Sequence, residues 1–219
     1  MKTTSKKTLK SVTDSKPIKK TKKSVDKTKE KELSKSVKKV VKKASKTESN
    51  TKVKKETKPA KEKFVSHLTS LKTGDKAPYF EGLNQDGKVF SLTDYKGKKL
   101  ILYFYPKDNT PGCTTQSCNL QANINQLKKE GYEVVGVSAD DVKSHKKFAD
   151  KFSLSFNLLA DTEKRALRDY DVFGKKMFMG RIFDGIIRTT FVISEAGKIL
   201  HVINGVDVAD HTNQIRKLK

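Results

Sequence analysis

The chain has 219 residues, with 48 Lys and Arg against 25 Asp and Glu and a formal net charge of +23. It holds no run of about 18 apolar residues, which excludes a membrane-spanning helix, and its N-terminus lacks the apolar region of a secretory signal. Because the first 63 residues contain seven acids and no arginine, a mitochondrial transit peptide is not expected either, and we predict an intracellular, cytoplasmic protein.

The positive charge is concentrated in residues 1–63. This segment carries 24 Lys, no Arg and 7 acids, a net charge of +17, which leaves +6 for residues 64–219. All 17 aromatic residues lie at or after Phe64. A segment of this composition cannot bury enough apolar surface to offset its ordering entropy. We therefore predict a disordered Lys-rich basic tail over 1–63 and one domain of about 155 residues over 64–219.

Three roles for the predicted tail stay open. It is a solvated extension without a partner, or it binds DNA or RNA nonspecifically, because +17 in a flexible chain attracts phosphates. An anionic membrane surface is the third partner, disfavoured by the lack of aromatic anchors. Apolar residues at helical spacing within 35–46 would allow an amphipathic helix on a partner. Residues 16–23 resemble a nuclear import signal, so nuclear or nucleoid association is an alternative to a cytoplasmic location.

After Phe64 the sequence alternates between strand and helix patterns. Asp86-Gly87 between two short apolar runs indicates a β-hairpin, because both residues tolerate positive φ. Residues 99–105 are apolar on both alternating faces, as in a central strand covered on both sides, and Pro106 ends this strand. The strands expected in chain order are 79–83, 88–92, 99–105, 133–139, 156–160, 189–194 and 198–203.

Helices are expected between the later strands and at the C-terminal end. Leu120, Ile124 and Leu127 recur at the spacing of one helical face. The helices expected in chain order are about 114–129, 143–152, 162–170 and one from about 208. This order predicts an α/β domain with a mixed central sheet and helices on both faces, which is compatible with a thioredoxin-like fold.

Two cysteines, Cys113 and Cys118, follow the loop after the expected central strand. A thiol in the first turn of a helix faces unpaired N–H groups and the positive end of the helix dipole, which favour a reactive thiolate. Thr110 is able to present its hydroxyl to the same pocket, and the ring of Pro106 is able to wall off one side. The alternative is a pair of buried, unreactive cysteines. The His and Cys spacing gives no zinc ligand pattern, and the Cys-x-x-Cys of thioredoxin-type exchange is absent.

The five-residue spacing of the cysteines predicts a redox switch. If Cys113 and Cys118 are both helical, their Cα atoms are about 8.6 Å apart. A disulfide tolerates a Cα separation of at most about 7 Å. The helix must therefore unwind before the two sulfurs can join.

Residues 103–118, YFYPKDNTPGCTTQSC, resemble the active-site segment of the peroxiredoxins. More narrowly, they are similar to the Q-type group, also called bacterioferritin comigratory protein. The similarity extends from about Leu71 to the C-terminus and includes residues 74–78 and 178–188. The resemblance implies a thioredoxin-like fold and a thiol-specific peroxidase that reduces hydrogen peroxide and organic hydroperoxides in antioxidant defence.

The resemblance also implies roles for single residues. Cys113 is the peroxidatic cysteine and Cys118 the resolving cysteine, which together form an intramolecular disulfide. Pro106 and Thr110 shape the peroxide pocket, and Arg188 stabilises the thiolate and the departing oxygen. Thioredoxin or a similar dithiol restores the thiols, and no metal or other cofactor is needed. Because the resolving thiol is in the same chain, a monomer is favoured.

Some alternatives stay open. For Arg188, the alternative to a role at the thiolate is an ordinary surface arginine in an ion pair, which its charge alone would favour. After the second cysteine the family commonly has an aromatic or apolar residue and then Arg-Asp, whereas this chain has Asn119-Leu120-Gln121-Ala122. This departure concerns helix packing and reductant docking. The alternative functions are a polyanion-binding protein that uses the folded domain as a scaffold, and a thiol-based peroxide sensor.

Overall fold

The computed structural model describes residues 64–218. The predicted disordered tail, residues 1–63, lies outside the described residues. Within 64–218, no helix is both long enough and apolar enough to cross a membrane.

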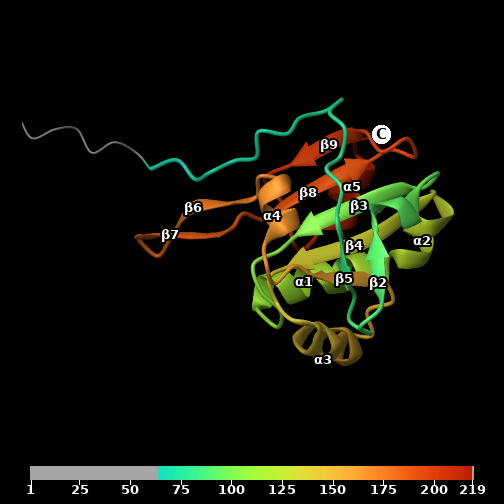
Figure 1. Cartoon of the computed structure of the whole chain (residues 1–219), viewed down its shortest axis with the longest axis horizontal. Helices are drawn as coiled ribbons and strands as arrows, with labels where there is room; N and C mark the ends of the chain where they lie inside the picture. The colour runs from blue at the N-terminus through green and yellow to red at the C-terminus, as the bar shows by residue number, and fades with distance from the viewer. Residues whose placement is uncertain (1–63, 219) are drawn as a thin grey trace, which may run out of the picture. The chain divides into compact units, whose positions relative to one another are not determined.

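A five-stranded sheet forms the centre of the domain, in the order β5-β4-β3-β8-β9 (Figure 1). β3 pairs with β4, and β4 with β5, in parallel, whereas β8 is antiparallel to both β3 and β9. The predicted mixed sheet is therefore confirmed. Its strands are β3 (Lys99–Phe104), β4 (Tyr132–Ser138), β5 (Asn157–Ala160), β8 (Thr189–Ile193) and β9 (Ile199–Ile203).

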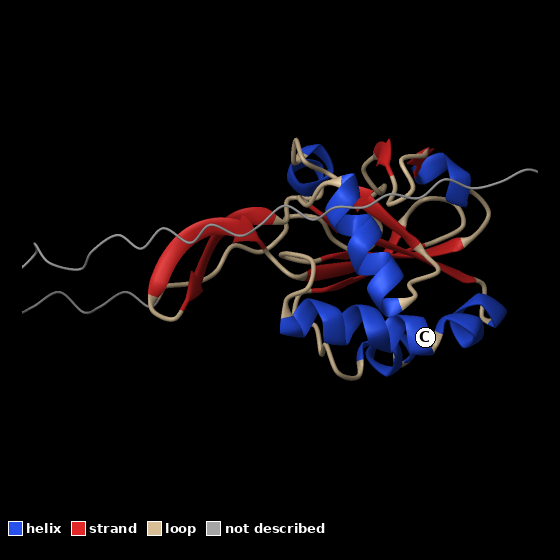
Figure 2. Cartoon of the chain, turned by 90° about the horizontal axis from the view of Figure 1, so that it is seen from below, coloured by secondary structure: helices blue, strands red, loops and turns tan. Residues whose placement is uncertain are grey.

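Helices cover both faces of this sheet, as Figure 2 shows. Alternate side chains of β3 point to opposite faces and so enter two separate cores. Leu100, Leu102 and Phe104 pack with residues of α4, whereas Ile101 and Tyr103 pack with residues of the other four helices. The helices are α1 (Pro111–Ala122), α2 (Ile124–Lys129), α3 (Val142–Phe152), α4 (Arg165–Asp169) and α5 (His211–Arg216).

The helix after β3 differs from the expected single helix over 114–129. It begins at Pro111, whose fixed φ suits the first helical position. It also ends at Ala122, because Asn123 leaves helical geometry, with φ −106° and ψ 8°, before α2 begins. The expectation of one continuous helix was therefore wrong, although Leu120, Ile124 and Leu127 do lie in one core.

Two antiparallel hairpins lie outside the central sheet. The first, β1 (Glu81–Leu83) with β2 (Val89–Ser91), confirms the Asp-Gly turn prediction. The second, β6 (Phe173–Phe178) with β7 (Arg181–Ile186), was not predicted and projects away from the sheet (Figures 1 and 2). Its two-residue turn, Met179-Gly180, has positive φ at both positions. β7 leads directly into Arg188, so this hairpin helps to place the arginine.

Candidate active site

Cys113 lies in the first turn of α1, as the sequence predicts, and the structure shows that it is buried. Pro111 takes the first helical position and Thr110 is the N-cap, so Cys113 is the third residue of the helix. The first amides of a helix have no intrahelical acceptor, and together with the helix dipole they favour negative charge. The sulfur therefore sits where a thiolate is stabilised.

Arg188 contacts Cys113 although it lies 75 residues later in the sequence. Its Nη2 donates a hydrogen bond to the Cys113 Sγ over 3.1 Å. Among residues 64–218, no carboxylate forms an ion pair with Arg188. Within the described residues the guanidinium is therefore directed at the thiol and not at a carboxylate.

Gln116, which sequence reasoning missed, holds the same guanidinium. The Nη1 of Arg188 donates to the Gln116 Oε1, so one arginine bridges the glutamine and the sulfur. The Gln116 side chain is fully buried, and its Nε2 has no hydrogen-bond partner among the described residues. An unpaired buried donor costs about 1–3 kcal/mol. A polar residue one helical turn after Cys113, on the buried side of α1, was the signal available in the sequence.

A second cation, Lys176 of β6, lies within electrostatic range of the thiol. Burial lowers the pKa of Lys176 and the charge of Arg188 lowers it further, whereas the charge of Cys113 raises it. Its Nζ donates to the Ile186 carbonyl over 2.9 Å and lies 5.7 Å from the centroid of the Phe183 ring. Sequence reasoning missed Lys176 because it missed the hairpin that carries it.

Thr110 and Pro106 lie on the loop that joins β3 to α1. The Thr110 hydroxyl donates to the Lys107 carbonyl over 3.0 Å, which leaves its oxygen lone pairs free to accept a hydrogen bond. The Thr110 carbonyl accepts the N–H of Thr114, the first bond of α1. Pro106 is the second residue after the end of β3 and is partly buried. Thr110 therefore lies at the N-cap of the helix that carries Cys113, whereas Pro106 lies at the other end of the loop that leads to it.

Cys118 lies in the same helix as Cys113, and both are free thiols. Two helical residues five positions apart are too far from each other to form a disulfide, so the two cysteines cannot join while this helix is intact. Partial burial raises the pKa of the Cys118 thiol. In the intact helix Cys118 is therefore protonated at neutral pH and out of reach of Cys113.

The residues that depart from the family pattern after Cys118 attach α1 to its neighbours. The Asn119 Oδ1 accepts from the N–H and the hydroxyl of Thr212, over 2.9 and 2.8 Å, and its Nδ2 donates to the Ala209 carbonyl over 2.8 Å. The Gln121 Oε1 accepts from the N–H of Ser155 over 2.8 Å. In this chain, polar contacts therefore join α1 to the start of α5, to the segment before it and to the loop between α3 and β5.

Residues 73–202 match the AhpC/TSA family, and this segment contains both cysteines and Arg188. Peroxiredoxin Bcp from Escherichia coli strain K12 is 43% identical over 144 residues, which cover 66% of this chain and 92% of that protein. A putative peroxiredoxin bcp from Coxiella burnetii is 44% identical over 146 residues, covering 67% and 97%. The crystal structure of a cysteine variant of PrxQ from Xylella fastidiosa superimposes with a TM-score of 0.64 at 31% identity, covering 69% of this chain and 97% of that one.

Proposed function

Because the chain belongs to the AhpC/TSA family and is a peroxiredoxin, a cysteine-based peroxidase with an antioxidant function, we propose which of its residues carry out the reaction. Its substrate is a hydroperoxide and its reductant is a thioredoxin-like dithiol. Cys113 is the peroxidatic cysteine, Cys118 the resolving cysteine, and Pro106, Thr110 and Arg188 complete the site.

In the first step the Cys113 thiolate attacks one oxygen of the hydroperoxide. The O–O bond breaks, the sulfur is oxidised to a sulfenic acid, and the other oxygen leaves as water or an alcohol. Arg188 donates to the sulfur before the attack and remains beside the charge that develops on the departing oxygen. Gln116 holds the guanidinium in this position.

In the second step α1 unwinds around the two cysteines. Cys118 then loses the burial that raises its pKa, so a larger fraction becomes thiolate. Its sulfur attacks the Cys113 sulfenic acid, a disulfide forms and water leaves. The dithiol reductant reduces this disulfide and restores both thiols.

The contact between the Arg188 Nη2 and the Cys113 Sγ carries this assignment, because it joins a guanidinium to a thiol at the start of a helix. The test is consumption of hydrogen peroxide coupled to thioredoxin oxidation, with the wild-type chain and Cys113→Ser. We expect turnover to be lost in the variant. Turnover at the wild-type rate would contradict the role of Cys113.

The resolving role is tested separately with Cys118→Ser. We expect Cys113 in this variant to react once with peroxide and to accumulate as a sulfenic acid that dimedone traps. Because no resolving thiol remains in the chain, steady-state turnover with thioredoxin should fall sharply. If the wild-type chain accumulates trappable sulfenic acid to the same extent, Cys118 does not resolve it.

Two finer proposals concern association. The first is a monomer, which is favoured because both thiols are in one chain and no second chain is needed to form the disulfide. Nonspecific binding of nucleic acid rests on the charge of residues 1–63, which lie outside the described residues, and would place the protein at the nucleoid or in the nucleus. A salt-dependent mobility shift of DNA with the full chain, lost in a chain shortened to residues 64–219, would support it; equal shifts would refute it.

A further inference from the structure

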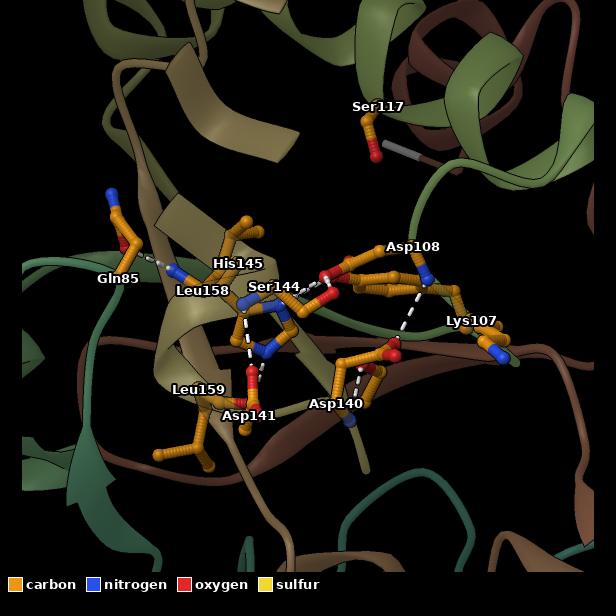
Figure 3. A network of polar contacts seen from close by, with 12 residues as sticks. Gln85, Lys107, Asp108, Ser117, Asp140, Asp141, Ser144, His145, Leu158 and Leu159 are labelled. Carbon is orange, nitrogen blue, oxygen red and sulfur yellow. Dashed lines mark hydrogen bonds and ion pairs between the residues drawn. The ribbon is translucent and has the colours of Figure 1, made fainter. Parts of the chain in front are cut away.

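A buried polar network surrounds Asp108, in the middle of the loop between β3 and α1 (Figure 3). The Asp108 side chain is 2% exposed. Its Oδ1 accepts from the Tyr105 hydroxyl over 2.8 Å. Its Oδ2 accepts from the Ser144 hydroxyl over 2.8 Å and from the His145 Nδ1 over 2.9 Å. Three donors therefore fix this carboxylate, two of them from α3.

The network holds Asp108 as a carboxylate. Burial raises the pKa of Asp108, but the hydrogen bond and charge of His145 and the hydrogen bonds of Ser144 and Tyr105 lower it more, so the pKa lies below its ordinary value. His145 is itself fully buried, and its Nε2 faces the Leu159 carbonyl of β5 over 3.1 Å. The imidazole is thus held between the loop and the sheet.

The backbone of the loop is held at the same residue. The Asp108 N–H donates to the Asp140 Oδ2 over 2.9 Å, and this oxygen also accepts from the Ser138 hydroxyl over 2.7 Å (Figure 3). Residue 108 is therefore attached to α3 through its side chain and, through its backbone, to Asp140 in the segment that joins β4 to α3.

This attachment determines where the Thr110 hydroxyl lies. The hydroxyl donates to the carbonyl of Lys107, the residue directly before Asp108. Between Asp108 and Thr110 the chain turns sharply, with Asn109 at φ 57°. A non-glycine residue keeps this conformation when its surroundings enforce it. Because Asp108 is fixed, the Lys107 carbonyl before it is also fixed, and this carbonyl accepts the hydrogen bond of the Thr110 hydroxyl.

We propose that His145 and Ser144 are positioning residues for the peroxidase reaction. Through Asp108 they fix the Lys107 carbonyl, and with it the Thr110 hydroxyl, at the place where the hydroperoxide binds. A buried hydrogen bond adds little net stability compared with apolar residues of similar shape, so stability alone does not account for the contact between His145 and Asp108. The inference rests on the roles proposed for Cys113 and Thr110.

The test is the second-order rate constant for oxidation of Cys113 by hydrogen peroxide, measured by stopped flow on the full chain. Thr110→Val removes the hydroxyl, and we expect a loss of about 100-fold. His145→Leu should lose about tenfold, while His145→Asn, which keeps a donor toward Asp108, should recover most of the rate. In the Thr110→Val background, His145→Leu should cause no further loss, because both changes act through one hydroxyl.

His67→Asn is the matched control, since His67 forms the other His–Asp contact of the domain, 2.7 Å from Asp171. It should react at the wild-type rate. If His145→Leu does not fold, Ser144→Ala takes its place in the same double-mutant cycle. We expect Ser144→Ala to lower the oxidation rate about threefold in the wild-type background and not at all in the Thr110→Val background.

Three results would overturn the inference. The first is a wild-type rate in both His145→Leu and Ser144→Ala, and the second is a loss in either variant that multiplies with that of Thr110→Val. The third is an equal loss of the oxidation rate in His145→Leu and His145→Asn, which would show that His145 has only a structural role. Consumption of hydrogen peroxide by Cys113→Ser at the wild-type rate contradicts the proposed function instead, so the two failures are distinguishable.

Discussion

At the scale of single residues, the arginine that acts on the thiol is held by a glutamine. One guanidinium nitrogen of Arg188 bonds Cys113 and the other bonds Gln116. A guanidinium presents its donors in a rigid plane, so fixing one nitrogen orients the other. Gln116 therefore acts on the reaction through Arg188, and it does so at the cost of an unpaired buried Nε2.

Gln116→Met separates these two effects. Methionine fills a similar volume but offers no acceptor to Arg188, so we expect the rate of Cys113 oxidation to fall by about tenfold. The free energy of unfolding should change by less than about 1 kcal/mol, because the lost hydrogen bond is offset by removal of the unpaired donor. Stopped flow and urea unfolding measure the two quantities. Gln126→Met, at an exposed position on α2, is the control.

The outcome that would count against this account is an unchanged oxidation rate in Gln116→Met. A large loss of stability without a loss of rate would likewise show that Gln116 serves the fold rather than the arginine.

Some of these residues were predictable from the sequence and others were not. Cys113 and Thr110 belong to one short segment, whose turn and helix start indicate a reactive thiol. The contact of Arg188 with the thiol could be expected from the family resemblance alone. Gln116 and Lys176 were missed, because the role of the first depends on an arginine 72 residues away and that of the second on an unpredicted hairpin.

At the scale of elements, the proposed mechanism requires α1 to be stable enough to present Cys113 and yet to unwind for Cys118. Its buried Ser117 bonds the Tyr103 hydroxyl on β3 over 2.9 Å. Directly after Cys118, the side chain of Asn119 makes hydrogen bonds to Thr212 and Ala209. These contacts oppose unwinding at the position where the resolving thiol must move.

Asn119→Ala should therefore accelerate the second chemical step. We expect the conversion of Cys113 sulfenic acid to disulfide to become several-fold faster, while the peroxide step keeps its rate and the free energy of unfolding falls by about 2 kcal/mol. Acid quench, thiol alkylation and mass spectrometry follow the two steps. Asn213→Ala on α5, which removes an exposed bond to Asp210, should leave both rates unchanged. Slower disulfide formation in Asn119→Ala would contradict the idea that this contact resists unwinding.

The predicted helices and strands agree with the structure where a clear sequence pattern determines the element. The predictions were wrong where the backbone geometry of one or two residues determines it. The apolar run of β3 and the Asp-Gly hairpin of β1 and β2 were predicted correctly. The break of the helix at Asn123 was missed, because the apolar spacing continues across it. The β6–β7 hairpin was missed because Met179 is an unusual residue at positive φ, and because its exposed apolar side chains do not alternate with polar ones.

At the scale of the whole molecule, a buried histidine ties stability to pH. His211 at the start of α5 is fully buried, with Nδ1 facing the Gln214 Oε1 over 3.2 Å and Nε2 facing the Thr190 hydroxyl over 3.1 Å. Burial lowers the pKa of His211 to about 4, and the charge of Arg188 also lowers it, against the opposing hydrogen bond of Gln214. The ring is therefore neutral in the folded chain at neutral pH.

Stability should fall as the pH falls from about 6.5 to about 4. In this window the unfolded chain binds a proton at His211 that the folded chain does not, so the unfolded state gains free energy of protonation. The loss from this residue is about 3 kcal/mol and stops below about pH 4, where both states are protonated. Urea unfolding at pH 7, 5.5 and 4.5 measures it. His211→Gln should flatten this part of the profile, and His201→Gln, at a partly exposed position on β9, should not. Equal slopes for wild type and His211→Gln would refute the assignment.

The net charge of +23 is a property of the whole chain and does not indicate the chemistry of the site. Most of that charge lies in residues 1–63, whereas the site consists of two thiols, one arginine and the groups that hold them. The class of fold followed from the alternation of strands and helices, since each element carried its own periodicity. The pairing of Arg188 with Cys113 was expected only through the family resemblance, because contacts across 75 residues have no local pattern.

The most direct measurement is peptide mapping of the wild-type chain after one equivalent of hydrogen peroxide, with free thiols alkylated before digestion. We predict a single peptide linked internally between Cys113 and Cys118, lighter by two hydrogens than the reduced form, and loss of alkylation at both cysteines together. Oxidation of Cys118 while Cys113 remains alkylated, or stable oxidation of Cys113 with Cys118 still free, would contradict the account.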